Sequence, residues 1–170
     1  MGYVNDVNFA QFISPFEFGY TAGTWTVTVA TNVVCNVRTA GDASFTALVP
    51  VKIPSNTVEL KGARLKSIDV WYKIGTAAAD DFATVTLEKM NLKVDASVVT
   101  GAAVTAVTID TAHNTDAKRL AQGDHKMTVT LDTPVWVLPT EQYWLTLIVN
   151  AALTTAFRFF GASANYELRV

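Results

Sequence analysis

The chain has 170 residues, of which 50% are hydrophobic and 16% are charged, and its formal net charge is −2. This composition predicts one folded domain with a core of its own and excludes a disordered chain, which needs few apolar residues and much charge. The slightly acidic balance argues against nucleic acid or a membrane surface as the main partner, because both recruit clustered Lys and Arg. We also expect no secretory signal and no membrane-spanning segment, because no apolar run approaches the ~20 residues that a span needs.

The first 22 residues differ in character from the rest of the sequence. They are rich in aromatic side chains without a clear period: Phe9, Phe12, Phe16, Phe18 and Tyr20. We therefore treat 1–22 as an N-terminal arm or extension and 23–170 as a single β-sandwich domain. The extension has two interpretations, an arm that docks on a neighbouring subunit or a segment that lies across its own sandwich. The second is favoured, because exposed aromatic side chains promote aggregation.

From residue 24 onward, apolar and polar residues alternate, which is the period of a half-buried strand. The segments that show this pattern are 24–29, 33–37, 45–49, 63–74, 82–89, 104–109, 125–131, 136–138, 143–149, 156–160 and 163–170. In the segment 82–89 we expect Ala83, Val85 and Leu87 to face the core. Residues 116–121 are compatible with one short helix in a loop.

About nine to eleven strands at this spacing are typical of an all-β sandwich or barrel. Turn signals separate the segments, for example at 39–42, 54–56, 61–62, 78–81 and 122–124. The sequence therefore predicts an all-β fold, a two-sheet antiparallel sandwich of jelly-roll type with an N-terminal extension. The pattern does not predict the order of the strands.

The residues that carry chemistry are few and scattered. Cys35 is the single cysteine, so the chain forms no internal disulfide, and its strand-like surroundings favour a buried small side chain. Asp80 and Asp81 are adjacent and belong to a predicted turn, because neighbouring residues of an extended segment point in opposite directions and do not form a glycosidase pair. We expect no enzyme activity and no cofactor.

The two histidines, His113 and His125, have no metal-ligand spacing. His125 alternates with apolar residues and is expected to be a partly buried strand residue. His113 lies in a polar loop where Asp110, Asn114 and Asp116 offer oxygen atoms that a calcium ion accepts. That loop lacks the regular spacing of a calcium-binding loop, so no metal site is predicted.

Two of the four tryptophans, Trp71 and Trp144, lie out of phase with the apolar positions of their own strands. We therefore expect both on outer faces of the sandwich. One interpretation is a carbohydrate-binding surface, because aromatic faces stack on sugars. The other is that a neighbouring subunit covers these strands, which fits a surface poor in charge and rich in threonine. The threonines alone have a simpler explanation, because Thr is a good strand former.

Three stretches carry a resemblance to a known group of proteins. They are 45–54, which reads FTALVPVKIP, then 60–72, which reads LKGARLKSIDVWY, and 160–168, which reads FGASANYEL. Over residues 43–170 the sequence resembles small jelly-roll structural proteins of tailed phages, of the capsid-decoration, head-fibre or tail-accessory type. The resemblance implies a component of the virus particle, often trimeric, and it transfers no catalytic residues. The N-terminal segment falls outside it.

We therefore expect a non-enzymatic structural protein of the virion, assembled in the host cytoplasm, that acts by self-association and by docking on other virion proteins. The alternative is a carbohydrate-binding module for attachment to a host or a glycan. The expected partners are further copies of the chain, with a trimer favoured, and a glycan in the alternative; nucleic acid and membrane are not expected. The candidate subunit or glycan contacts are Phe9, Phe12, Phe16, Phe18, Trp71 and Trp144.

Overall fold

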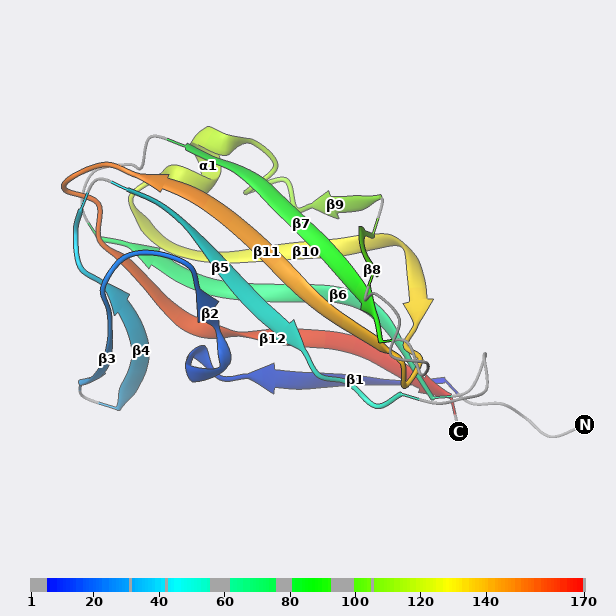
Figure 1. The fold of residues 1–170 in the computed structure, drawn as a ribbon. Helices are drawn as coiled ribbons and strands as arrows, with labels where there is room; N and C mark the ends of the chain where they lie inside the picture. The colour runs from blue at the N-terminus through cyan, green and yellow to red at the C-terminus, as the bar shows by residue number, and fades with distance from the viewer. Residues whose placement is uncertain are drawn as a thin grey trace, which may run out of the picture.

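The computed structural model describes residues 6–30, 32–41, 43–55, 62–75, 81–92, 100–104 and 106–169. These residues form two antiparallel sheets that face one another (Figure 1). Helical structure in the described ranges consists of the 3-10 turn η1 (Pro15–Glu17) and the helix α1 (Asp116–Leu120), the short helix that the sequence predicts. The predicted all-β, two-sheet antiparallel sandwich of jelly-roll type is confirmed.

The larger sheet, sheet A, has seven strands. In hydrogen-bonded order they are β3 (Trp25–Ala30), β4 (Val33–Arg38), β12 (Phe157–Arg169), β6 (Gly62–Ile74), β10 (Gly123–Trp136) and β9 (Val107–Ile109), while β1 (Asp6–Ile13) pairs with β12. Sheet B has five strands. Their order is β2 (Gly19–Tyr20), β5 (Ala43–Val51), β11 (Glu141–Ala151), β7 (Asp81–Asn91) and β8 (Thr100–Ala103).

The core lies between the two sheets and consists of the inward positions that the alternation predicts. On β6 of sheet A, Ile68, Val70 and Tyr72 are completely buried, and on β11 of sheet B so are Leu145 and Leu147. Each strand hides one side of its alternating pattern, because successive side chains of a strand point to opposite faces. The other positions of the same strands form the two outer faces of the molecule.

Bulges change two details of the prediction. The expectation that Ala83 faces the core is wrong: Ala83 is exposed and its neighbour Phe82 is completely buried. The register between β7 and β11 shifts at this point, and a bulge reverses which residues face inward. The two last predicted strands are one continuous strand, β12. Its register with β6 shifts between Phe159 and Gly161.

The N-terminal segment joins the sandwich of its own chain. Strand β1 pairs with β12 from Asp6, opposite Arg169, to Ile13, opposite Ala162. Behind it, the amide of Asn36 donates a hydrogen bond of 2.6 Å to the carbonyl oxygen of Pro15. The domain boundary predicted at residue 22 is not tested by this arrangement and stays a prediction.

Some predicted features fall on residues that the structure does not describe. The turn signals at 39–42, 54–56, 61–62 and 78–81 lie partly outside the described ranges, and so does the predicted segment 104–109 at residue 105. Asp80 is also outside the described ranges. In the part of the chain that is described, no helix has the length and apolar character needed to cross a membrane.

Candidate functional site

The outer face of sheet A carries aromatic and hydrogen-bonding side chains from four strands. We call this surface the A face and define it by the outward residues of β1, β12, β6 and β10: Ala10, Phe12, Ser67, Asp69, Trp71, Lys126, Thr128, Thr130, Gly161, Ser163 and Asn165. They share one face because residues directly opposite each other in antiparallel strands point to the same side of a sheet. The alternation therefore builds this face from segments far apart in the sequence.

Two aromatic side chains flank a glycine on the A face. Gly161 of β12 lies opposite Trp71 of β6. On its other side is Phe12 of β1, because a Cβ built on Gly161 would lie 2.7 Å from Cζ of Phe12. Gly161 has a φ of 133°, which residues with side chains rarely adopt. A glycine at this point lets the Phe12 ring lie against β12, where a larger residue would collide with that ring.

Polar groups continue the A face alongside the rings. The carboxylate of Asp69 accepts hydrogen bonds from the Thr128 hydroxyl (2.6 Å) and the Asn165 amide (3.2 Å), and it lies 3.3 Å from Nζ of Lys126. The same Lys126 ammonium is 5.5 Å from the centre of the Trp71 ring, a cation–π distance. The charges on this part of the face therefore neutralise one another while the Trp71 ring stays half-buried.

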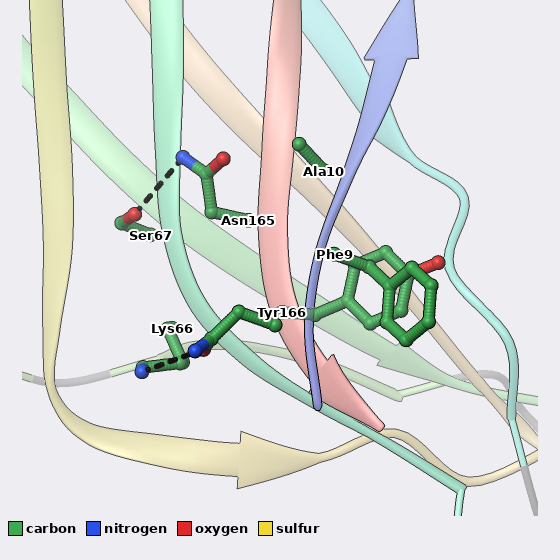
Figure 2. Close-up of a pocket in the computed structure, with 7 residues that line it drawn as sticks. Phe9, Ala10, Lys66, Ser67, Asn165 and Tyr166 are labelled. Carbon is green, nitrogen blue, oxygen red and sulfur yellow. Dashed lines mark hydrogen bonds between the residues drawn. The ribbon is translucent and has the colours of Figure 1, made fainter. Parts of the chain in front are cut away.

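A pocket of about 400 Å³ opens beside this network, lined by Asn8, Phe9, Ala10, Lys66, Ser67, Asn165 and Tyr166. Its position follows from a bulge. Asn165 pairs with Ser67 but the next residue of β12 pairs with Leu65, so Lys66 is the extra residue of β6. Lys66 reaches across β12 to the side-chain oxygen of Asn8 at 3.2 Å. Figure 2 shows Asn165 and Ser67 pointing toward each other at this pocket, where the Asn165 amide donates to the Ser67 hydroxyl at 3.1 Å.

The outer face of sheet B, the B face, is built differently. Its outward residues on β7 and β11 are Thr84, Thr86, Glu88, Gln142, Trp144, Thr146 and Ile148. The indole N–H of Trp144 donates a short hydrogen bond of 2.6 Å to Glu88 Oε2, which also accepts from the Thr146 hydroxyl at 2.9 Å. Trp71 and Trp144 thus both lie on outer faces, as their phase indicates, but on opposite sides of the sandwich. They do not form one joint surface.

The other candidate contact residues are spread over the N-terminal segment. Phe9 is 45% exposed and stacks on Tyr166, with 5.8 Å between ring centres. It lies on the opposite side of β1 from its neighbour Ala10 (Figure 2). Phe16 in η1 is also exposed. Phe18 is buried and packs against Phe159, so in this structure it is a core residue and not a surface contact.

The structure brings the two histidines together, which their sequence positions did not indicate. His113 Nε2 lies 3.1 Å from His125 Nδ1, and His113 Nδ1 lies 2.9 Å from a carboxylate oxygen of Asp110. Burial raises the pKa of Asp110, but hydrogen bonds from the Thr128 amide, His113 and the Ala112 amide outweigh it and hold that pKa below its ordinary value.

The oxygen-bearing side chains of this loop have separate partners. Asp116 accepts a hydrogen bond from the Phe82 amide and Asn114 accepts one from Lys118, so neither side chain joins Asp110. Within the described ranges, no group of three or more His, Cys, Asp or Glu side chains is arranged to hold a metal ion. Cys35 is buried, as its strand pattern indicates.

Sequence reasoning identified both rings of the A face but missed the residues between and beside them. Gly161, Asp69 and Asn165 were not singled out, because their meaning depends on which strands lie side by side. One signal was present: an isolated glycine within a strand pattern often marks a bulge or a close approach. Gly161 is such a residue.

No family model matches the chain, and no curated protein matches it. Among solved structures, it is similar to the carbohydrate-binding module TmCBM61 in complex with β-1,4-galactotriose (10% identity, TM-score 0.42, covering 92% of this chain and 91% of that one). It is also similar to the family 11 carbohydrate-binding module from Clostridium thermocellum in complex with a β-1,3-1,4-mixed-linked tetrasaccharide (7% identity, TM-score 0.42, 91% and 94%). A third similar structure is the enzymatically active domain of bacteriophage CBA120 tailspike protein 4 (11% identity, TM-score 0.41, 88% and 20%).

Proposed function

We propose that this domain is a non-catalytic carbohydrate-binding module and that the A face is its binding surface. The observation that carries the proposal is that two aromatic residues adjoin Gly161 on this face, Phe12 through its ring and Trp71 as the residue paired with the glycine. A sugar ring has apolar C–H faces that stack on aromatic rings, and its hydroxyl groups need hydrogen-bonding partners at the edges. Trp71 is half-buried and Phe12 is 60% exposed, so both rings are accessible.

The polar groups beside the rings can bind sugar hydroxyl groups both as hydrogen-bond donors and as hydrogen-bond acceptors. The Lys126 ammonium donates hydrogen bonds and the carbonyl oxygen of the Asn165 side chain accepts them. The buried Asp69 carboxylate holds both side chains in place. The pocket at Asn165 and Lys66 adds room for a further part of a chain-like ligand. In this proposal the surface binds by stacking and hydrogen bonding, and no residue needs to perform a reaction.

The test is a glycan array followed by calorimetry on the strongest hit. Trp71→Ala is expected to weaken binding at least about tenfold, or ~1.4 kcal/mol, because it removes one of the two stacking surfaces. Trp144→Ala is the matched control, since it removes the same side chain from the opposite face. An array without hits, or an equal loss of affinity in the two variants, would contradict the proposal.

A second candidate is the structural protein of a tailed-phage virion. It is supported by where the apolar side chains remain exposed. Most of the large exposed hydrophobic residues belong to the N-terminal part of the chain: Val7, Phe9, Phe12, Phe16, Val27, Val29, Val33 and Val34. A concentration of exposed apolar side chains is typical of a protein contact. In this candidate, copies of the chain associate, in the trimer that the resemblance implies, and dock on the particle after assembly in the host cytoplasm.

This second candidate is tested by measuring whether the protein binds to phage capsids or tails. Purified protein is mixed with capsids and with tails of a phage that encodes it, and sedimentation through a cushion measures what binds. Stable association with one of the two supports the candidate, and the double variant Phe9→Ser, Phe16→Ser is expected to weaken it. Absence of association with both would remove it and leave the carbohydrate proposal intact, because that proposal needs no particle.

A further inference from the structure

Strand β3 ends sheet A with an unpaired backbone. In the described part of the chain, β3 pairs with β4 and with no other strand. The amide of Thr39 donates to the carbonyl oxygen of Thr24 at 3.1 Å, so this pair sets the phase of the ladder. Because hydrogen-bonded and non-hydrogen-bonded pairs alternate in an antiparallel ladder, Trp25, Val27 and Val29 direct their N–H and C=O groups away from β4. These groups form an open edge.

The side chains near this edge are apolar and exposed. Val27 is 58% exposed and Val29 is 71% exposed, and on the neighbouring strand Val33 and Val34 are 48% and 38% exposed. The strand itself, WTVTVA, contains no charged residue, no proline and no glycine. Natural sheet edges usually carry such residues, or are very short, because they would otherwise recruit another strand.

Other edges of the two sheets have the usual protection. The strands β2, β8 and β9 have two, four and three residues, which is too short for extended pairing. Strand β1 is long, but Asp6 at its start is held in an ion pair with Arg169 of β12. Among the described strands, β3 therefore combines length, exposure and lack of charge.

The occupant of such an edge must be an extended strand, because only a strand satisfies alternating N–H and C=O groups. The sequence of β3 is complementary to itself. An antiparallel pair with its two-fold axis at Thr28 places Val27 opposite Val29 of the second copy, and both direct their backbone groups into the new ladder. Thr28 then lies opposite Thr28 of the second copy. Two uncharged strands approach without repulsion, which favours a second copy over a charged peptide.

We propose that β3 is a dimerisation strand, which pairs with β3 of a second copy and joins the two A sheets into one continuous sheet. A two-fold contact uses the same edge on both copies and closes at a dimer. This differs from the trimer that the resemblance implies. It is also independent of carbohydrate binding, since the pairing edge lies outside the A face.

The experiment is sedimentation velocity on the full chain over a wide range of concentrations. The expected species has twice the mass of the 18.4 kDa chain. Val27→Pro removes an amide from the open edge while leaving the ladder with β4 intact, so it is expected to weaken dimerisation at least about tenfold. Circular dichroism and the melting temperature show whether this variant is folded.

A pair of lysine variants keeps the test decisive if the proline variant does not fold. Val29 and Val34 lie directly opposite each other and share one face of the hairpin. Val29→Lys places a charge on the pairing strand and is expected to produce a monomer, whereas Val34→Lys, one strand further in, is expected to remain a dimer. Equal loss in both variants would indicate docking through the valine face and overturn the proposal. A wild-type chain that stays monomeric at every concentration, or forms a trimer, would also overturn it.

Discussion

Trp71 faces outward on the A face and Trp144 faces outward on the B face, yet the two side chains have different surroundings. The Trp71 ring lies beside Gly161 and beneath the Lys126 ammonium, next to the Asp69 and Asn165 side chains. The Trp144 indole N–H donates a hydrogen bond to Glu88, in a surface otherwise built of threonines, Gln142 and Ile148. Strand phase decides that a tryptophan faces outward. Its neighbours on adjacent strands decide whether its surroundings suit a ligand.

The largest expected difference between the faces concerns their glycines. Gly161→Ala should lower the free energy of unfolding by about 2–3 kcal/mol, because the new Cβ meets the Phe12 ring and the backbone is held at positive φ. Gly101 of β8 in sheet B is the control: its Cβ would meet only the Lys89 carbonyl oxygen at 3.8 Å. Gly101→Ala should change stability by less than about 0.5 kcal/mol. Urea unfolding measures both, and equal values would mean that Gly161 has no special role.

A smaller difference is expected for the carboxylate at the centre of each face. Asp69→Asn should cost about 1–2 kcal/mol, because Asp69 accepts two side-chain hydrogen bonds and faces the Lys126 ammonium. Glu88→Gln should cost about 0.5–1 kcal/mol, because Glu88 accepts from Trp144 and Thr146 and its network contains no cation in the described contacts. Denaturant unfolding at neutral pH checks the order. A larger cost for Glu88→Gln would show that the B face holds the stronger polar network.

Lowering the pH should destabilise the fold through Asp110, which directly follows β9 at one edge of sheet A. Its pKa is lowered in the folded protein, so it stabilises the fold above its unfolded pKa, and that contribution disappears as pH falls through the folded value. The wild-type chain should therefore lose stability as the pH falls below about 4, the ordinary pKa of an aspartate, and Asp110→Asn should make that loss shallower. Unfolding by denaturant at several pH values measures the slope. An unchanged slope in the variant would assign the acid sensitivity to other carboxylates.

The smallest effect is expected at Lys126. Its side chain is 54% exposed, so its ion pair with Asp69 and its contact with the Trp71 ring should together contribute less than about 1 kcal/mol to stability. Lys126→Ala is expected to leave the melting temperature nearly unchanged while weakening glycan binding several-fold. A loss of stability above about 2 kcal/mol would instead make Lys126 a structural element of the sheet.

The amount that the sequence predicted differs between the parts of the candidate site. Trp71 was identified because it is out of phase with the apolar pattern of its own strand. Phe12 was identified only as one of several aromatic residues in the N-terminal segment. Gly161 and Asp69 were missed, since the sequence around them does not show which ring lies against a glycine or which strands an aspartate joins. Phe18 was assigned to the surface but is buried, because the irregular N-terminal segment offers no period from which to infer its direction.

The sequence by itself determined the class of fold and, for most strands, which residues face the core, because the alternation of side chains along a strand is a local property with a period of two. Only the tertiary structure decided which strands are neighbours. It placed Trp71 and Trp144 on opposite sides, brought His113 to His125, and left β3 at an edge. These outcomes depend on pairing between segments far apart in the chain, and a bulge of one residue is enough to reverse a face.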